Sequence, residues 1–143
     1  MKKSLLIVIA SLLILSCKKD KGDKNNCTTD TASITGAYKI TAVTYKASST
    51  ASEIDYFDIL FPDACERDDT YTFSLNGGYT IDDTGLVCSP ASDDNGTWSV
   101  SGNIMTIDGD AVDIKSFDCK YLVIVNSDTQ TSGDKLTLTL TRQ

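Results

Sequence analysis

The chain has 143 residues and a formal net charge of −7, and it contains no histidine. The acidic balance argues against nucleic-acid binding, which depends on clustered lysine and arginine. The missing histidine removes Ser-His-Asp and Cys-His catalysis and the common zinc sites built on imidazole. We therefore predict no enzyme activity, no metal site and no cofactor.

The N-terminus has the three-part layout of a secretory signal. Two lysines stand near the start, an eleven-residue run that is apolar except for Ser11 occupies positions 5–15, and the small Ser16 follows. Eleven residues of helix cover only about 16 Å, against roughly 30 Å of hydrocarbon in a bilayer. The segment therefore favours an export signal over a membrane-spanning helix.

Residues 14–17, Ile-Leu-Ser-Cys, resemble the lipobox of bacterial lipoproteins. The resemblance implies that residues 1–16 are a signal peptide and that Cys17 carries lipid, palmitate included, and begins the mature chain. It places the protein in the cell envelope of a diderm bacterium, anchored in the outer membrane. Lysine and aspartate directly after the cysteine resemble a surface-export signal. The alternative is a plain signal peptide followed by an unrelated cysteine.

Residues 17–33 are polar and lack apolar periodicity, which predicts a flexible tether after the lipidated residue. A coil of this length reaches about 20–24 Å root-mean-square, enough to hold a domain clear of the lipid headgroups. Residues 34–143 remain, and they suffice for one domain with one core.

From residue 34 on, apolar residues recur with period two. The run 136–142 alternates leucine and threonine, which is typical of a half-buried strand. Asn76-Gly77-Gly78 joins two such runs and is a strong hairpin signal. About eight strands at this short spacing favour an antiparallel sandwich or barrel. The predicted strands cover residues 36–45, 71–75, 79–82, 96–100, 104–108, 110–117, 121–125 and 136–142.

One segment, residues 52–61, departs from the period of two. Ile54, Phe57 and Phe61 recur at helical spacing, and Pro62 ends the segment. We therefore expect a short helix or an irregular lid between the first two strands.

Short motifs occur along the domain in a distinctive order. They are Gly36-Ala37-Tyr38, Cys65-Glu66-Arg67-Asp68, Phe73 to Gly77, Cys88, Gly96-Thr97-Trp98 and Arg142. This order resembles the lipocalin-like domain of bacterial envelope lipoproteins over residues 36–142. The resemblance implies a single all-β, eight-stranded antiparallel up-and-down barrel with a short helix between the first two strands, and a small hydrophobic ligand.

The resemblance also implies roles for individual residues. It places a disulfide between Cys65 and Cys88. Cys27 and Cys119 are then left over, and their pairing is possible but not expected. In related barrels an arginine on the last strand covers an aromatic ring on the first. Here Arg142 would cover Tyr38, which stands where lipocalins usually have tryptophan, through a cation–π contact of about 0.5–2 kcal/mol.

The inward-facing apolar residues allow two interpretations. An eight-stranded barrel is just wide enough to fill with side chains or to hold one small ligand. We expect a ligand, if bound, to lie near Trp98, with residues 52–61 covering the entrance. The candidate ligand-binding residues are Tyr38, Phe73, Tyr79, Trp98 and Met105. The wider inward set adds Ile40, Leu75, Val100, Ile107, Ile114, Leu122, Leu138 and Leu140.

Acidic residues are frequent, and most stand where turns are predicted. The pairs Asp68-Asp69, Asp82-Asp83 and Asp93-Asp94 fit solvated turns better than a glycosidase-type acid and base. Asp108, Asp110 and Asp113 carry oxygen atoms, but their spacing fits no EF-hand loop.

Two function classes therefore stand at this point. The first is a membrane-anchored envelope lipoprotein whose barrel binds a small hydrophobic ligand. The second is a scaffold lipoprotein with a filled barrel whose outer surface contacts a protein or a glycan.

Overall fold

The computed structural model describes residues 27–143, so the predicted signal peptide and the lipid on Cys17 lie outside the described residues. The strands are β1 (Gly36–Lys46), β2 (Ile54–Asp55), β3 (Thr70–Phe73), β4 (Gly78–Asp82), β5 (Asp94–Ser101), β6 (Ile104–Ile107), β7 (Asp110–Phe117), β8 (Tyr121–Ser127) and β9 (Lys135–Arg142). The helices are α1 (Thr31–Ile34), α2 (Phe57–Leu60) and the 3₁₀ helix η1 (Ala64–Arg67). Within this part of the chain, no helix has the length and apolar character needed to cross a membrane.

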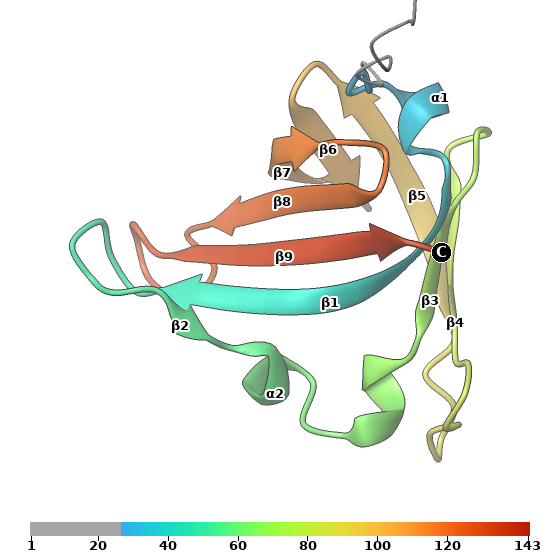
Figure 1. The fold of residues 1–143 in the computed structure, drawn as a ribbon, viewed down its shortest axis with the longest axis horizontal. Coiled ribbons are helices and arrows are strands. Elements are labelled where there is room, and N and C mark those ends of the chain that lie inside the picture. Colours follow the sequence, from blue (N-terminus) through green and yellow to red (C-terminus); the bar gives the residue numbers. More distant parts are fainter. Residues whose placement is uncertain (1–26) are drawn as a thin grey trace, which may run out of the picture.

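The strands form one antiparallel sheet that closes on itself (Figure 1). Neighbours along the chain pair from β3 to β9, and β9 returns to β1 over a register running from Tyr38↔Arg142 to Lys46↔Lys135. The closed barrel has eight strands, as predicted, and β2 is one extra strand that pairs with the end of β1. The predicted short helix is α2, which lies below β1 in Figure 1, whereas α1 lies above it.

The β3–β4 hairpin shows how local chemistry fixes register. Gly77 adopts φ +87°, which glycine tolerates best, and the Asn76 side chain accepts a hydrogen bond from the Gly78 N–H at 3.0 Å. Phe73 then pairs with Tyr79. The inward prediction for Leu75 is wrong: β3 ends at Phe73, and Leu75 lies in the turn with 66% of its surface exposed.

The core side chains lie inside the barrel and follow the period of two. Trp98 pairs with Ile107 and Val100 with Met105, so that these side chains share the inner face of β5 and β6. The predicted core omits Val43, which a register shift between Ile40 and Ala42 turns inward. The buried apolar residues are Ile34, Tyr38, Ile40, Val43, Phe73, Tyr79, Trp98, Met105, Val112, Ile114, Leu122, Ile124 and Leu140.

The end of the predicted tether is part of the folded domain. Asp30 caps α1 by accepting a hydrogen bond from the Ser33 N–H at 2.8 Å, and Ile34 is fully buried. Cys27 forms a disulfide with Cys119, in the β7–β8 turn, with a Cα–Cα distance of 5.5 Å. This pairing was possible but not expected from the sequence, and it forms because the packing of Ile34 brings the N-terminal segment back against the barrel.

Candidate functional site

The five candidate ligand-binding residues meet inside the barrel, packed against one another. The Phe73 ring lies 5.0 Å from Trp98, 5.8 Å from Tyr38 and 6.1 Å from Tyr79, measured between ring centroids. Met105 is fully buried beside them. The polar tips are already bonded: the Trp98 Nε1–H donates to the Ser74 carbonyl at 2.9 Å, and the Tyr38 hydroxyl to the Ile34 carbonyl at 2.7 Å. These rings therefore form core at one end of the barrel.

Arg142 closes this end. Its guanidinium carbon lies 5.1 Å from the Tyr38 ring centroid and 5.7 Å from that of Phe117. The same group donates to the Tyr38 hydroxyl at 2.6 Å and to the Ser33 carbonyl. One cation thus joins α1, β1 and β7 to the last strand, and we call this end of the barrel the closed end.

The opposite end, which we call the mouth, contains a cavity of about 330 Å³. Asp110 pairs with Ile107, and Leu138 pairs with Ile124, so these side chains share the inner face of the sheet. The cavity is lined by Ile107, Val112, Ile124, Leu136 and Leu138, with Asp108, Asp110 and Asn126 among them. It therefore combines an aliphatic wall with a few polar groups, as small-molecule sites do.

Asp108 is held in place at the rim of this cavity. It accepts hydrogen bonds from the Tyr79 hydroxyl at 2.5 Å and from the Thr97 N–H at 2.8 Å. The hydrogen bond to Asp108, together with burial, raises the pKa of Tyr79 to about 12. A Cβ on Gly96 would collide with the Asp108 carboxylate, so the glycine before Thr97 makes room for this contact. Nothing in the spacing of these residues along the chain indicates that arrangement.

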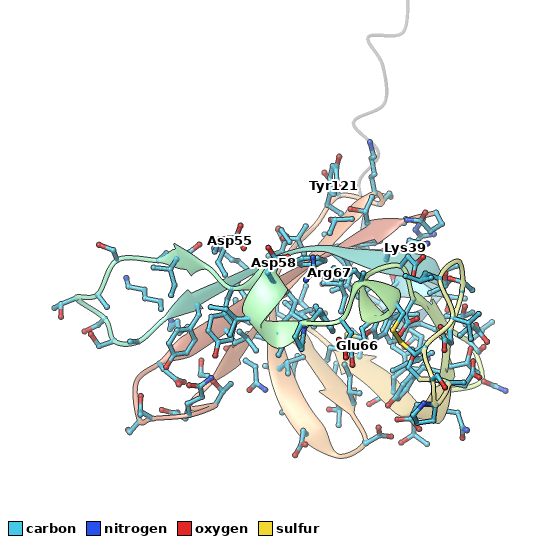
Figure 2. All side chains as sticks on the ribbon, turned by 90° about the horizontal axis from the view of Figure 1, so that it is seen from below. Lys39, Asp55, Asp58, Glu66, Arg67 and Tyr121 are labelled. Carbon is cyan, nitrogen blue, oxygen red and sulfur yellow. A yellow bond between two sulfur atoms is a disulfide. The ribbon has the colours of Figure 1, made fainter. Side chains whose placement is uncertain are left out.

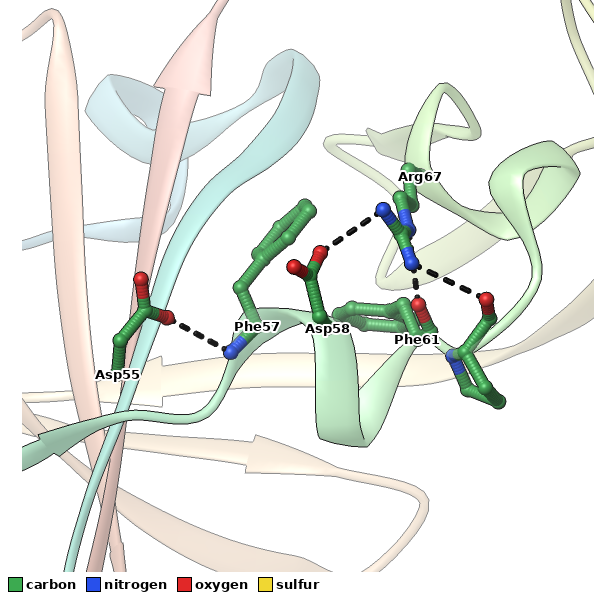
Figure 3. Close-up of polar contacts among 6 residues, drawn as sticks. Asp55, Phe57, Asp58, Phe61 and Arg67 are labelled. Atoms are coloured by element: carbon green, nitrogen blue, oxygen red, sulfur yellow. Dashed lines mark hydrogen bonds and ion pairs between the residues drawn. The ribbon is translucent and has the colours of Figure 1, made fainter.

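The β1–β3 connection lies over the mouth as a cap, which we define as residues 54–67. In Figure 2 the α2 turn and η1 lie in front of the barrel, with Asp55, Asp58, Arg67 and Glu66 along them. Figure 3 shows the contacts that shape the cap: Asp55 accepts from the Phe57 N–H at 3.0 Å, and Arg67 pairs with Asp58 at 2.8 Å.

Arg67 also donates to two backbone carbonyls of the cap. Its Nε bonds the Phe61 carbonyl at 2.9 Å, and its Nη2 bonds the Pro62 carbonyl at 3.0 Å (Figure 3). Three groups from one turn of chain thus converge on one guanidinium, whose planar fork is suited to this task. Arg67 thereby links η1 to the end of α2.

Beneath the cap lies a second cavity of about 280 Å³, between α2 and the inner face of β3 and β4. Tyr71 pairs with Ile81, and both line it. Its full lining is Leu60, Phe61, Glu66, Asp69, Tyr71, Ile81 and Ser92. Burial raises the pKa of Tyr71 to about 12, and the charges of Asp69 and Glu66 add to the effect.

The acid pairs are not all solvated as predicted. Asp69 is only 5% exposed, and it accepts a hydrogen bond from the Ser92 hydroxyl at 2.9 Å. Burial raises its pKa, and the charges of Asp83, Asp68 and Glu66 raise it further. Asp69 is buried because the loop between β4 and β5 folds back over it, an arrangement that pairwise spacing in the sequence does not reveal.

The implied disulfide between Cys65 and Cys88 is present, with a Cα–Cα distance of 5.2 Å, and it ties η1 to the β4–β5 loop. A cavity of about 650 Å³ lies beside it, lined by residues 63–66 and 86–92. Leu86 and Val87 in its wall are largely exposed, so we assign this hollow to the loop surface.

No cluster of three or more His, Cys, Asp or Glu side chains that could hold a metal ion occurs within residues 27–143. The carboxylates of Asp108, Asp110 and Asp113, whose spacing fits no EF-hand loop, do not form such a cluster, and the Asp108 carboxylate accepts hydrogen bonds from Tyr79 and Thr97.

Comparison with known proteins gives a family match. The family model of the lipocalin-like domain matches residues 34–142, which is almost the whole described barrel. No curated protein and no solved structure matches the chain.

Proposed function

Because the chain belongs to the lipocalin-like domain family, we propose that it is a lipid-anchored envelope protein that binds a small apolar ligand in the mouth of its barrel. The observation that carries this proposal is the cavity of about 330 Å³ on the inner faces of β6 to β9. Its volume is at the lower end of the range for small-molecule sites. The role is binding without catalysis.

The lining of the cavity limits the ligand. Five aliphatic side chains favour an apolar body, whose burial contributes about 25 cal/mol per Å² of apolar surface. Asp108 and Asp110 disfavour an anionic head group near the rim. We therefore propose a neutral compound, such as an alcohol of medium chain length, rather than a fatty acid anion.

Two observations favour the scaffold hypothesis. Ile54 and Ile59 on the cap are 50% and 59% exposed, and the closed end of the barrel is filled with aromatic side chains. A protein partner would cover such apolar side chains. A small ligand would bind in the cavity, whereas a protein partner would bind on the outer surface. A variant that fills the cavity should therefore weaken ligand binding and leave binding of a protein partner unchanged.

The test of ligand binding uses the fluorescence of Trp98, the only tryptophan, because it pairs with Ile107 at the edge of the cavity. We expect 1-decanol or retinol to shift the emission. Val112→Phe fills the cavity and should weaken binding at least about tenfold, or 1.4 kcal/mol. Val125→Phe, on the outer face of β8, is the matched control and should change affinity less than about twofold.

A flat titration with alcohols from hexanol to dodecanol, with retinol and with a neutral steroid would contradict ligand binding. The lipid anchor is tested separately by mass spectrometry of the mature protein. We expect a chain that starts at Cys17 and carries acyl groups, and a Cys17→Ser variant that no longer fractionates with membranes. An unacylated mature chain would overturn this part of the proposal.

A further inference from the structure

Asp69 has one carboxylate oxygen without a hydrogen-bond partner. Its Oδ2 accepts from the Ser92 hydroxyl at 2.9 Å, whereas its Oδ1 is buried and unbonded. The whole residue is 95% buried, since only 5% of its surface is exposed. Burying a polar group without a partner is unfavourable, and burying an unpaired charge is far more so.

No cation of the described chain pairs with this carboxylate. Arg67 is the nearest candidate in sequence, but it bonds Asp58 and the carbonyls of Phe61 and Pro62. Lys39 donates instead to the backbone carbonyl of Asp68 at 2.6 Å. Over residues 27–143 the ion pair between Arg67 and Asp58 is the only one, so Asp69 lies in a region of uncompensated negative charge.

Three further carboxylates strengthen this negative region. Glu66 lines the same cavity. Burial raises the pKa of Asp69, and the negative charges of Asp83, Asp68 and Glu66 raise it further. An external cation would reverse this effect, because it stabilises the ionised carboxylate. A compact metal ion does not fit, since no three such ligands converge in the described part of the chain.

Apart from Asp69, Glu66 and Ser92, the cavity is lined by aliphatic and aromatic side chains. Leu60 and Phe61 come from the cap, and Tyr71 and Ile81 from the inner face of β3 and β4. A ligand that fits must therefore combine a cationic hydrogen-bond donor with a short apolar body. Leu60 and Phe61 hold their positions because Arg67 fixes the end of α2 (Figure 3).

We propose that the cavity beneath the cap is a second binding site, which takes a small alkylammonium ion, with its nitrogen facing the carboxylates of Asp69 and Glu66 and its alkyl chain against Phe61 and Ile81. The volume of about 280 Å³ suits a primary amine of roughly six carbon atoms. The site is distinct from the cavity on β6 to β9, with which it shares no lining residue.

The test compares three ligands of equal length with the full protein at pH 7.4. Hexylamine, which is protonated at this pH, should bind measurably in calorimetry. 1-Hexanol should bind at least about tenfold more weakly at the Asp69 site, and hexanoate should not bind there. The comparison of hexylamine with 1-hexanol is made in Val112→Phe, where the cavity on β6 to β9 is filled, and equal affinity for the two in that variant would overturn the proposal.

Asp69→Asn keeps the shape of the side chain and removes its charge, so hexylamine affinity should fall at least about tenfold. Asp82→Asn is the matched control, because Asp82 is exposed at the end of β4, where it pairs with Thr70 rather than lining the cavity. It should change affinity less than about twofold. Unchanged affinity in Asp69→Asn would overturn the proposal.

A second variant keeps the proposal testable if Asp69→Asn folds poorly. Ile81→Phe narrows the apolar half of the cavity and leaves the carboxylate in place, and it should also weaken hexylamine binding. Val112→Phe should leave hexylamine binding unchanged. Loss of hexylamine binding in that variant would show that the amine binds in the cavity on β6 to β9, and this would overturn the proposal of a second site. Amine binding that depends on Asp69, without any binding of neutral alcohols, would support this site and contradict the function proposed above.

Discussion

At the scale of single residues, the acidic composition serves to order turns. Asp83 accepts hydrogen bonds from the Cys88 and Ser92 N–H groups, both at 3.0 Å. Asp118 accepts from the N–H groups of Lys120 and Tyr121. Carboxylates that accept several backbone N–H bonds satisfy donors that would otherwise need water. Many of the aspartates therefore stabilise loops, and acidity by itself does not mark a functional site.

Asp134 is the clearest case and gives a prediction. It is fully buried, and it accepts from the Thr129, Gln130 and Thr131 N–H groups at 2.7 to 3.0 Å and from the Tyr45 hydroxyl at 3.0 Å. Burial acts to raise its pKa, but the hydrogen bonds outweigh it and lower the pKa to about 2. Asp134 therefore contributes stability that is complete above its ordinary pKa, near 4, and is lost as pH falls towards about 2.

We expect Asp134→Asn to lower the midpoint of thermal unfolding at pH 7, and the gap to wild type to close between about pH 4 and pH 2. Asp113→Asn, on the exposed side of β7, is the control and should change the midpoint little at either pH. A gap of equal size at pH 7 and pH 2.5 would show that Asp134 acts through its shape rather than its charge.

At the scale of elements, the cap differs from the hairpins in what stabilises it. Every hairpin is fixed by a strand register, whereas α2 has only four residues and relies on side-chain contacts. Arg67 provides three of these contacts, two of them to backbone carbonyls. The ion pair with Asp58 is exposed to solvent and contributes little, about 0–1 kcal/mol. The carbonyl contacts should therefore matter more than the ion pair.

We expect Arg67→Ala to speed amide hydrogen exchange at Leu60 and Phe61 at least about fivefold, while the free energy of unfolding falls by less than about 1 kcal/mol. These amides donate to the Tyr56 and Phe57 carbonyls within α2, so their exchange reports opening of the cap. Asp58→Asn removes only the ion pair and should leave exchange within about twofold of wild type. Equal effects of the two variants on hydrogen exchange would show that the ion pair between Arg67 and Asp58, and not the contacts to the two carbonyls, stabilises the cap.

At the scale of the whole molecule, two disulfides stabilise opposite ends of the barrel. Cys27–Cys119 joins the segment before α1 to the β7–β8 turn at the closed end. Cys65–Cys88 joins η1 to the β4–β5 loop at the mouth. Their sequence separations are 92 and 23 residues, so the first restricts the unfolded chain more strongly than the second.

In the chain-entropy model, loops of these lengths correspond to about 4.6 and about 3.4 kcal/mol. We therefore expect the double variant Cys27→Ser/Cys119→Ser to lose about 1 kcal/mol more unfolding free energy than Cys65→Ser/Cys88→Ser. Chemical denaturation of both variants, with peptide mapping of the remaining disulfide, measures the difference. A larger loss from the Cys65–Cys88 pair would mean that native contacts of the cap outweigh chain entropy.

The sequence by itself determined most of the strands, and the resemblance of its motif order to the lipocalin-like domain determined the closed barrel. Period-two alternation in the run 136–142 and the Asn76-Gly77-Gly78 turn act locally, through side-chain direction and backbone φ, so they can be read without the rest of the chain. The motif order around Tyr38, Trp98 and Arg142 added the family, whose model matches residues 34–142.

Only the tertiary structure decided where the barrel is filled and where it is hollow. Trp98 and Phe73 belong to a packed closed end, whereas the cavities lie at the mouth, lined by Val112 and by Asp69. The pairing of Cys27 with Cys119 was decided there too. These features depend on contacts between residues far apart in the chain, and the volume left between such side chains is set by how the strands and the cap pack together.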